Sequence, residues 1–299
     1  MRRVIITGAS GFIGSALVPA FVLAGWEVFE LGRQPSGRQG TNWLPFDLRT
    51  GVIPALPAAD LTIHAAYDFR AVRWSEINAF NVQGTWDLFE KCRDTGIPRF
   101  IFVSSMAAFP GCRSLYGRAK LETERRLLAA GAVVVRPGFV IGPGARGLAR
   151  TIQTMASRLP VVPVIGYGRQ RLLPCHVDDL CQALLKLSES AQPKLRPVLL
   201  AARTSITLAE LVRHIGRVHN HHVMVLPVPA AAIRWTLAIA EWWGVKLPLR
   251  SDSVVSLTHQ NPMPFDGVDR LAGVTFRELH DVAMSDAQDP GKGSALTPT

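Results

Sequence analysis

Short apolar runs alternate with helix-length segments through the first two thirds of the chain. The apolar runs predict strands at Val4–Thr7, Val28–Leu31, Leu61–His64, Phe100–Val103 and Ala132–Val135. Helices are predicted between several of these runs, at Ile13–Ala24, Glu76–Thr95 and Tyr116–Ala130. Strands that alternate with helices are typical of βαβ units, so we expect a parallel sheet with right-handed crossovers and helices on both faces.

The pattern changes after Arg136. The stretch RPGFVIGPGARG is rich in Gly and Pro and predicts a loop. Further on, LLPCHVDDLCQALLKLSES predicts a strand that enters a helix, and PVLLAA predicts one more strand of the sheet. From Ser205 to about Leu279 helices alternate with short strands, which is the pattern of a smaller lobe.

These patterns predict two parts and a tail. Residues 1–142 and 170–203 are expected to form the main α/β domain, and residues 143–169 and 204–283 the smaller lobe. Residues 284–299 are polar and rich in Gly and Pro, so we predict a disordered tail there.

The longest apolar stretch, Pro229–Trp243, is too short and too interrupted to cross a membrane. A spanning helix needs about 18 or more consecutive apolar residues, whereas Arg234 and Glu241 interrupt this one. We predict an amphipathic helix that is buried against the core. A helix that lies on a membrane surface is the alternative, so peripheral membrane contact stays open while an integral membrane segment is not expected.

Composition narrows the class of protein. Of the 299 residues 48% are hydrophobic and 19% are charged, which is typical of a packed globular protein. The net charge of +10 suits nucleic acid, an anionic membrane or a small anion as partner. The Lys and Arg residues are scattered, however, which favours a site for an anionic cofactor and a small-molecule substrate over nucleic acid.

Cysteine usage and the N-terminus indicate the cytoplasm. The four cysteines form no CxxC pair, so no zinc or other metal site is predicted, and free thiols suit a reducing compartment. MRRVIITGAS passes from two arginines into a short strand and a glycine turn, without the longer apolar region of a signal peptide.

A glycine-rich turn joins the first predicted strand to the first predicted helix. VIITGASGFIGSAL places Gly8, Gly11 and Gly14 at this junction. Glycine lets the backbone turn tightly and approach a pyrophosphate, towards which the helix directs its free N–H groups. A glycine triplet alone also fits an ordinary tight turn, but its position in the first βαβ unit favours binding of a dinucleotide.

The end of the second strand indicates which dinucleotide binds. An acidic residue there would bind the ribose 2′-hydroxyl of NAD, but this chain has Gly32 and Arg33. Arg33 can pair with a 2′-phosphate, and Arg38 is a further candidate. Glu30 lies earlier, within the strand. NADP(H) is therefore favoured, with NAD(H) as the alternative.

Two segments carry residues suited to proton transfer. Tyr116 and Lys120 are four residues apart, which places them on one face of a helix. An ammonium group nearby lowers the pKa of a tyrosine, which can then exchange a proton while hydride moves to or from a nicotinamide. Ser104 and Ser105 end a predicted strand, where ligands bind in open α/β sheets, and a serine there can hydrogen-bond a substrate oxygen.

Taken in order, these and other motifs resemble the extended short-chain dehydrogenase/reductase family, also called the NAD-dependent epimerase/dehydratase family. The resemblance runs from Arg3 to about Leu279. The motifs are TGASGFIG (Thr7–Gly14), FDL (Phe46–Leu48), HAA (His64–Ala66), NVQGT (Asn81–Thr85), VSS (Val103–Ser105), YGRAK (Tyr116–Lys120), RPGFVIGPG (Arg136–Gly144) and HVDDL (His176–Leu180).

The resemblance implies a Rossmann-type, doubly wound parallel α/β sheet with a smaller C-terminal α/β substrate lobe. It also assigns a role to each matched residue. Gly8, Gly11, Phe12, Ile13 and Gly14 would hold the pyrophosphate, Asp47 and Leu48 would meet the adenine, and Ala65, Ala66 and Asn81 would lie along the cofactor. Ser105, Tyr116 and Lys120 would be catalytic, Tyr116 and Lys120 would also bond the nicotinamide ribose, and Ser104, Pro137, Gly138 and Phe139 would lie near the nicotinamide end of the cofactor.

Two departures from the family pattern bear on the reaction. The missing acidic residue after the second strand supports NADP(H). The segment from Ser105 to Tyr116 is also shorter than is common in the family's sugar-nucleotide enzymes, which argues against a standard sugar-nucleotide substrate. We therefore expect an NADPH-dependent carbonyl reductase or the reverse alcohol dehydrogenase. The alternatives are a nucleotide-sugar epimerase or dehydratase with retained cofactor, and a cofactor-sensing protein without catalysis.

Two further expectations concern binding partners. Arg70, Arg73 and Arg146 are candidates for binding anionic groups of a substrate. By the family resemblance, the helices at Glu76–Thr95 and Tyr116–Ala130 would pair with their copies in a homodimer, for which Trp86, Leu88 and Phe89 offer apolar surface.

Overall fold

The computed structural model describes residues 1–189, 195–243, 250–271 and 273–281. These residues form one large sheet of eight parallel strands, in the order β14-β11-β6-β5-β4-β1-β2-β3. The strands are β1 (Arg3–Thr7), β2 (Glu27–Gly32), β3 (Thr41–Pro45), β4 (Leu61–His64), β5 (Phe100–Val103), β6 (Val133–Pro137), β11 (Val198–Leu200) and β14 (Asp269–Arg270). The structure thereby confirms the predicted parallel sheet of a Rossmann-type fold.

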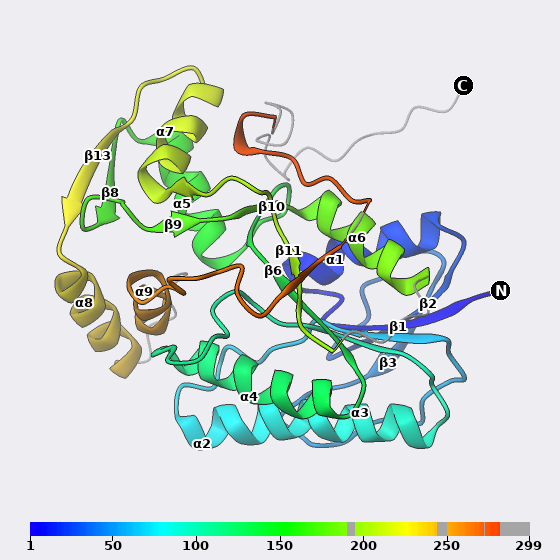
Figure 1. Cartoon of the computed structure of the whole chain (residues 1–299). Coiled ribbons are helices and arrows are strands. Elements are labelled where there is room, and N and C mark those ends of the chain that lie inside the picture. The colour runs from blue at the N-terminus through cyan, green and yellow to red at the C-terminus, as the bar shows by residue number, and fades with distance from the viewer. Residues whose placement is uncertain (190–194, 244–249, 272, 282–299) are drawn as a thin grey trace, which may run out of the picture.

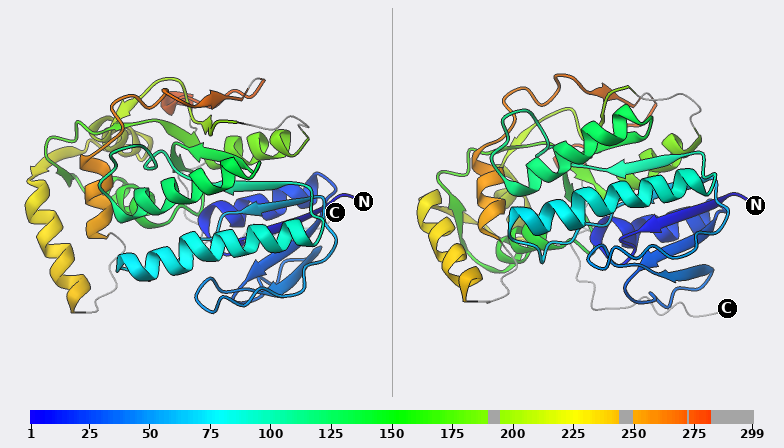
Figure 2. Two further views of the ribbon diagram at one scale, coloured as in Figure 1. Left: turned by 60° about the horizontal axis from the view of Figure 1, so that its bottom comes forward. Right: turned by 90° about the horizontal axis from the view of Figure 1, so that it is seen from below.

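Helices cover both faces of this sheet (Figures 1 and 2). One face carries α1 (Phe12–Leu23) and α6 (Val177–Glu189), and the other carries α2 (Trp74–Ile77), the π-helix η1 (Asn78–Gln83), α3 (Gly84–Asp94) and α4 (Leu115–Ala129). Side chains of β1 alternate between the two cores: Val4 and Ile6 pack with Leu17 of α1, and Ile5 packs with Leu88 of α3. Apolar residues on both sides of a strand are what a doubly covered parallel sheet requires.

Most predicted elements agree with the structure, with three differences. The stretch RPGFVIGPGARG, predicted as a loop, contains the end of β6 and the strand β7 (Phe139–Ile141), because its apolar residues pair with a later segment of the chain. The helix predicted at Glu76–Thr95 is interrupted by the π-helix η1, a form that often occurs at functional sites. The strand β3 was missed, because this short edge strand is largely exposed and so has no run of apolar residues.

The smaller lobe packs around its own core, in which Ile152, Val164 and Leu211 meet. Its elements are α5 (Gly147–Arg158), β8 (Val161–Ile165), β9 (Arg171–Leu172), β12 (Ile206–Thr207), α7 (Leu208–Val218), β13 (Met224–Val228), α8 (Ala230–Trp242), α9 (Ser251–Thr258) and the short η2 (Leu279–Asp281). Two paired strands connect the large sheet and this lobe along the sequence. These are β7 (Phe139–Ile141), between β6 and α5, and β10 (Pro174–His176), between β9 and α6.

The division of the chain into two parts stays a prediction, although one detail qualifies it. The strand β14 lies within residues 204–283, which were assigned to the lobe, yet it pairs with β11 at the edge of the large sheet. The tail predicted at 284–299 lies outside the described residues.

The helix predicted at Pro229–Trp243 forms as α8, but only one side of it is buried against a core. Leu237 is buried and Ala230 and Ile233 pack on the lobe core, whereas Trp235, Ile239 and Trp242 are exposed. The reason is that α8 lies at the rim of the lobe and has α9 on one side only (Figure 1). None of the helices in the described part of the chain is long and apolar enough to cross a membrane.

Candidate active site

The glycine turn between β1 and α1 has the geometry that a dinucleotide requires. Gly8 has a φ of +71°, and a Cβ there would lie 2.8 Å from the Ala66 nitrogen, so only glycine fits. A Cβ at Gly14 would lie 2.2 Å from the Gly8 oxygen, which lets α1 pack closely on the turn. No described side chain caps the N-terminus of α1 at Gly11, so the amides of Phe12 and Ile13 open the helix without a side-chain partner.

The loop after β4 lies against this turn and is held by a buried hydrogen-bond chain. The Ala66 amide donates to Thr7 Oγ1 over 3.2 Å, and His64 bridges Thr7 Oγ1 and Thr85 Oγ1 at 2.8 and 2.9 Å. Burial, followed by the charge of Lys120, lowers the pKa of His64 to about 3, so this imidazole is neutral. Ala65 and Ala66 are thus fixed beside the glycine turn, and their place along the cofactor stays a prediction.

Asn81, which was predicted to lie along the cofactor, holds the loop that contains Asp68. This buried side chain accepts the Asp68 amide at 2.6 Å and donates to the Asp68 carbonyl at 3.3 Å, so it holds the loop that follows β4. The Asp68 carboxylate accepts hydrogen bonds from Arg49 and Arg70. Burial alone would raise the pKa of Asp68, but these two guanidinium groups bring it below its ordinary value.

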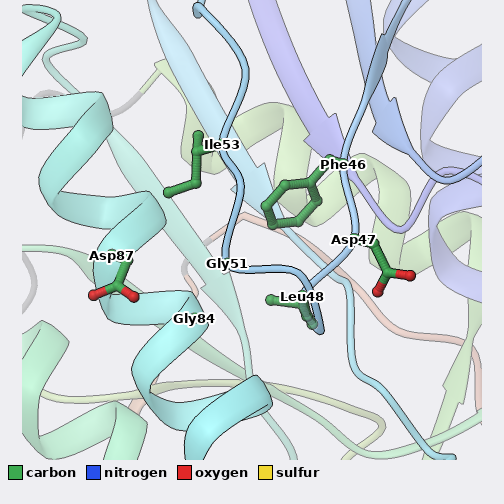
Figure 3. Close-up of a pocket in the computed structure, with 7 residues that line it drawn as sticks. All are labelled: Phe46, Asp47, Leu48, Gly51, Ile53, Gly84 and Asp87. Carbon is green, nitrogen blue, oxygen red and sulfur yellow. The ribbon is translucent and has the colours of Figure 1, made fainter.

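Asp47 and Leu48 follow β3 at the expected adenine end. They line a small pocket with Phe46, Gly51, Ile53, Gly84 and Asp87, in which Leu48 points towards α3 and Asp47 points away from it (Figure 3). The Asp47 carboxylate pairs with Arg70 at 3.3 Å, and Arg70 also pairs with Asp68 at 2.9 Å. Arg70 is therefore engaged by two carboxylates, which disfavours it as a substrate anchor, whereas Arg73 and Arg146 stay exposed.

Arg38 lies closer to the glycine turn than its place in the sequence suggests. Its guanidinium donates to the Ala9 carbonyl at 3.4 Å and pairs with Glu30 at 3.4 Å. The buried Glu30 carboxylate also accepts the Ser36 hydroxyl at 2.8 Å. Arg33 is exposed at the end of β2. The region where a ribose 2′-group would lie thus has two guanidinium groups, and its one buried carboxylate is already engaged.

The predicted catalytic residues come together at the carboxyl end of β5. The Ser105 side chain lies close enough to Tyr116 to counter, in part, the effect of burial on the pKa of the phenol. Lys120 lies one turn further along α4, is buried, and donates from Nζ to the Val103 carbonyl at 2.7 Å. The Ser104 hydroxyl is also buried, and it has no hydrogen-bond partner among the described residues. A buried hydroxyl without a partner fits a place reserved for a cofactor atom.

The two proton-bearing groups differ in one respect from the prediction. Burial raises the pKa of Tyr116 to about 12, partly offset by its hydrogen bond with Ser105, whereas we expected Lys120 to lower it. Burial also lowers the pKa of Lys120 to about 7, against the opposing charge of Glu124. The physical reason is shared: desolvation in the crowded site disfavours both the phenolate and the ammonium. The Lys120 Nζ lies 6.0 Å from the centre of the Tyr116 ring.

Two aromatic residues beside Tyr116 were missed from the sequence. The Tyr67 ring meets the Tyr116 ring edge-on at 4.9 Å, and the Phe69 ring stacks on it at 5.8 Å. Phe69 is exposed, so it adds apolar surface next to the Tyr116 ring. The only signal for these residues is that Tyr67 follows the HAA motif directly.

A segment of the smaller lobe also reaches this site and was missed. At the N-terminal end of α9, the Asp252 carboxylate accepts the backbone amides of Leu115 and Tyr116 at 2.8 and 3.0 Å. Arg250, just before α9, donates to the Phe69 carbonyl at 2.6 Å. No sequence signal reveals these contacts, because they join residues more than 130 positions apart.

The segment after β6 closes the far side of the site. Gly138 donates to the Leu200 carbonyl at 3.0 Å, and a Cβ there would lie 2.2 Å from the Leu173 oxygen. The preceding Pro137 is buried and the following Phe139 is half-buried. Residues 137–139 are therefore held tightly between β11 and the chain before β10.

Two further motifs form ion pairs that join separate segments of the fold. Within RPGFVIGPG, the Arg136 guanidinium pairs with the buried Glu124 of α4 at 2.5 Å. Within HVDDL, Asp179 accepts Arg277 at 2.9 Å, which anchors the C-terminal segment to α6. The part of the chain that the structure describes holds no group of three or more His, Cys, Asp or Glu side chains suited to a metal ion.

The chain is similar to several known proteins. The model of the NAD dependent epimerase/dehydratase family matches residues 4–198. A ceramide reductase from Caulobacter vibrioides is 29% identical over 250 residues, which cover 81% of this chain and 78% of that protein. A UDP-glucose 4-epimerase from Vibrio cholerae is 22% identical over 259 residues, covering 76% of this chain and 79% of that protein.

Among solved structures, a UDP-glucose 4-epimerase from Thermotoga maritima has a TM-score of 0.67 and 21% identity, covering 76% of this chain and 85% of that one. At this level of identity the likeness concerns the fold.

Proposed function

Given that the chain belongs to the NAD-dependent epimerase/dehydratase family, we propose that it is an NADP(H)-dependent oxidoreductase that reduces a carbonyl carbon or oxidises the corresponding alcohol. The observation that carries this proposal is that Ser105 lies beside Tyr116, with the buried Lys120 on the same helix as Tyr116. These three side chains supply a substrate-oxygen anchor, a transferable proton and a positive charge at one place.

The cofactor would lie across the carboxyl ends of β1, β4 and β5. The turn from Gly8 to Gly14 would hold its pyrophosphate against the open N-terminus of α1, and Ser104 would use its free hydroxyl at the nicotinamide end. Arg33 and Arg38 would bind a 2′-phosphate, which is why NADP(H) is proposed over NAD(H). The bound nicotinamide supplies or accepts the hydride.

The protonation state of the site favours reduction. With a pKa raised to about 12, Tyr116 keeps its proton at neutral pH and can donate it to an oxygen that becomes negative. Ser105 would orient that oxygen through its hydroxyl. Lys120 would keep a positive charge near the developing anion, and its ammonium is itself held by the Val103 carbonyl. Oxidation would first require the phenolate, which burial disfavours.

An apolar ketone is the substrate class that we propose. Tyr67 and Phe69 place aromatic surface directly beside Tyr116, and Arg70 is already paired with carboxylates. The relative from Caulobacter vibrioides is a ceramide reductase, hence named for a lipid substrate. A long-chain ketone would suit both observations better than a charged sugar nucleotide.

The test is a turnover assay with NADPH and a panel of ketones of increasing chain length, beside UDP-glucose with NADP⁺ as the hydride acceptor. A reductase consumes NADPH, so its absorbance falls with each turnover, whereas an epimerase returns the hydride and leaves the absorbance unchanged. The Tyr116→Phe variant is the control for each positive substrate. Conversion of UDP-glucose with NADP⁺ and without net formation of NADPH would overturn the reductase proposal in favour of the epimerase, and cofactor binding without any turnover would favour a sensing protein.

We also propose a homodimer and a cytoplasmic location. Leu88 and Phe89 are buried in the protein's own core, so the outer faces of α3 and α4 would have to pair mainly through half-buried Trp86 and polar residues. Light scattering at micromolar concentration tests the dimer, and a monomer mass would reject it. The four cysteines are free, which suits a reducing compartment.

A further inference from the structure

The end of the smaller lobe carries an exposed apolar surface of two adjoining parts. The first is one stripe of α8, where Trp235, Ile239 and Trp242 follow each other at helical spacing and are 63%, 55% and 84% exposed. The next residue, Trp243, is also exposed. Three of the chain's seven tryptophans therefore lie here in solvent, although burial of this segment is what its composition predicts.

The second part is the outer face of the strand pair β8–β13, which leads directly into α8 (Figure 1). Met224 lies opposite Val161 and Leu226 lies opposite Pro163, and all four side chains are exposed. We call these four residues and the α8 stripe together the rim surface. In Figures 1 and 2 α8 lies at the end of the molecule opposite the N-terminus, where no other described element covers its outer side. Exposed apolar side chains gathered on consecutive elements at one end of a lobe indicate an interaction site.

Charge at the rim surface indicates what it binds. Arg234 precedes Trp235, Arg158 precedes the exposed Leu159, and Arg169 stacks over the exposed Tyr167 with its guanidinium carbon 5.5 Å from the ring centre. Within the described residues none of these three arginines forms an ion pair with a carboxylate. Tryptophan and arginine side by side suit the interface of a bilayer, where indole rings lie at headgroup level and cations meet anionic lipids.

We infer that the rim surface docks this protein onto anionic lipid bilayers. A protein partner would explain the apolar stripe equally well, but an anionic bilayer also explains the three exposed arginines beside exposed apolar residues in a chain of net charge +10.

The rim surface is linked through α9 to the active site, so docking could deliver a lipid substrate. The helix α8 packs on α9, and the start of α9 contacts both the Phe69 carbonyl and the Tyr116 amide through Arg250 and Asp252. A lipid ketone taken from the bilayer at the rim would therefore enter next to exposed Phe69. This link to catalysis rests on the proposed function, whereas the docking itself does not.

Vesicle flotation with the full chain, without substrate, tests the docking. Phosphatidylcholine vesicles with and without phosphatidylglycerol are compared for the wild type and for Trp235→Ser/Ile239→Ser/Trp242→Ser. We expect the wild type to bind the anionic vesicles more tightly than the neutral ones, and the apolar variant to bind at least about tenfold more weakly. Arg158→Gln/Arg169→Gln/Arg234→Gln should lose the preference for anionic vesicles, by up to about fivefold per charge.

The matched control is Leu23→Ser/Val52→Ser, which removes two equally exposed apolar side chains from the large domain and should bind like the wild type. NADPH binding by every variant checks that each one folds. Wild-type protein that fails to bind anionic vesicles overturns the inference, as does an apolar variant that binds them unchanged. If the wild type ignores vesicles and instead forms a dimer that the apolar variant loses, the rim surface belongs to a second copy. None of these outcomes depends on turnover, so the reductase proposal stands or falls separately.

Discussion

The two ends of the candidate site are built in different ways. At the phosphate end, the turn that would face the pyrophosphate is one short stretch of chain from Gly8 to Gly14, which leads from β1 straight into α1 and has the loop after β4 packed on it. At the catalytic end, Tyr116 is surrounded by Ser105, the loop of Tyr67 and the start of α9, which lie far apart in sequence. The comparison teaches that a ligand held by backbone amides needs one local turn, whereas a proton donor needs surroundings that only tertiary packing provides.

The change that should affect only the catalytic end is Tyr116→Phe. It removes the proton donor and leaves the ring that packs on Tyr67 and Phe69. We expect kcat to fall by about 10²- to 10⁴-fold, the usual contribution of general acid catalysis, with little change in cofactor affinity. Steady-state kinetics with a ketone that is turned over, together with NADPH titration, measures both. Near-wild-type turnover by this variant would remove Tyr116 from the mechanism.

Replacement of Arg33 or Arg38, which would bind the 2′-phosphate, should change cofactor affinity and leave the catalytic end intact. Arg33→Ala should weaken NADPH binding by about 1.5–3 kcal/mol, or roughly 10- to 150-fold, because a charge-assisted contact with the 2′-phosphate is lost. NADH binding should hardly change. Arg38→Ala tests whether the guanidinium beside Ala9 shares this role, and the exposed Arg93 offers a control as Arg93→Ala. Equal affinity of the wild type for NADPH and NADH would contradict the proposed preference.

Lys120 connects the two ends, since it is expected to contact the cofactor ribose and to support Tyr116. Burial lowers its pKa to about 7 in the free protein, so its charge is present below that pH and is lost as the pH rises through it. Bound NADPH should raise the pKa of Lys120. NADPH affinity should therefore decrease by up to about tenfold per pH unit above 7 and level off once the pH exceeds the pKa of Lys120 in the complex. Lys120→Met should bind NADPH weakly, lose turnover and show a flat profile over this range. Parallel profiles for the two proteins would assign the pH dependence to another group.

The smallest effect should come from the remote segment. Asp252→Ala removes the carboxylate that accepts the Leu115 and Tyr116 amides, in the manner of a helix cap worth about 0.5–2 kcal/mol. We expect kcat to fall by about fivefold with unchanged NADPH affinity, because the start of α4 loosens while the glycine turn does not. Asp252→Asn, which keeps one acceptor oxygen, should recover part of the loss. Asp266→Ala, an exposed aspartate in the same lobe, is the control. An equal loss in cofactor affinity would show a general effect on the fold.

Most of the large domain was predictable because its signals are local. Apolar runs indicated five strands of the sheet, and the glycine spacing indicated the turn that only glycine can adopt. The spacing of Tyr116 and Lys120 indicated a shared helix face, since the α-helical repeat depends on nearby residues alone. The edge strand β3 escaped because it is exposed and has no apolar periodicity to reveal it.

What the sequence by itself determined was therefore the parallel sheet, the turn for a dinucleotide and the residue types for proton transfer. Tertiary structure alone decided the environment of those residues. Burial raises the pKa of Tyr116 against the expected effect of Lys120, and Asp252 reaches the catalytic helix from the other lobe. It also decided that the tryptophans of α8 face solvent, although their composition predicts a buried helix. The physical reason is the same in each case: desolvation, capping at a distance and exposure depend on which segments pack together, and no short stretch of chain carries that information.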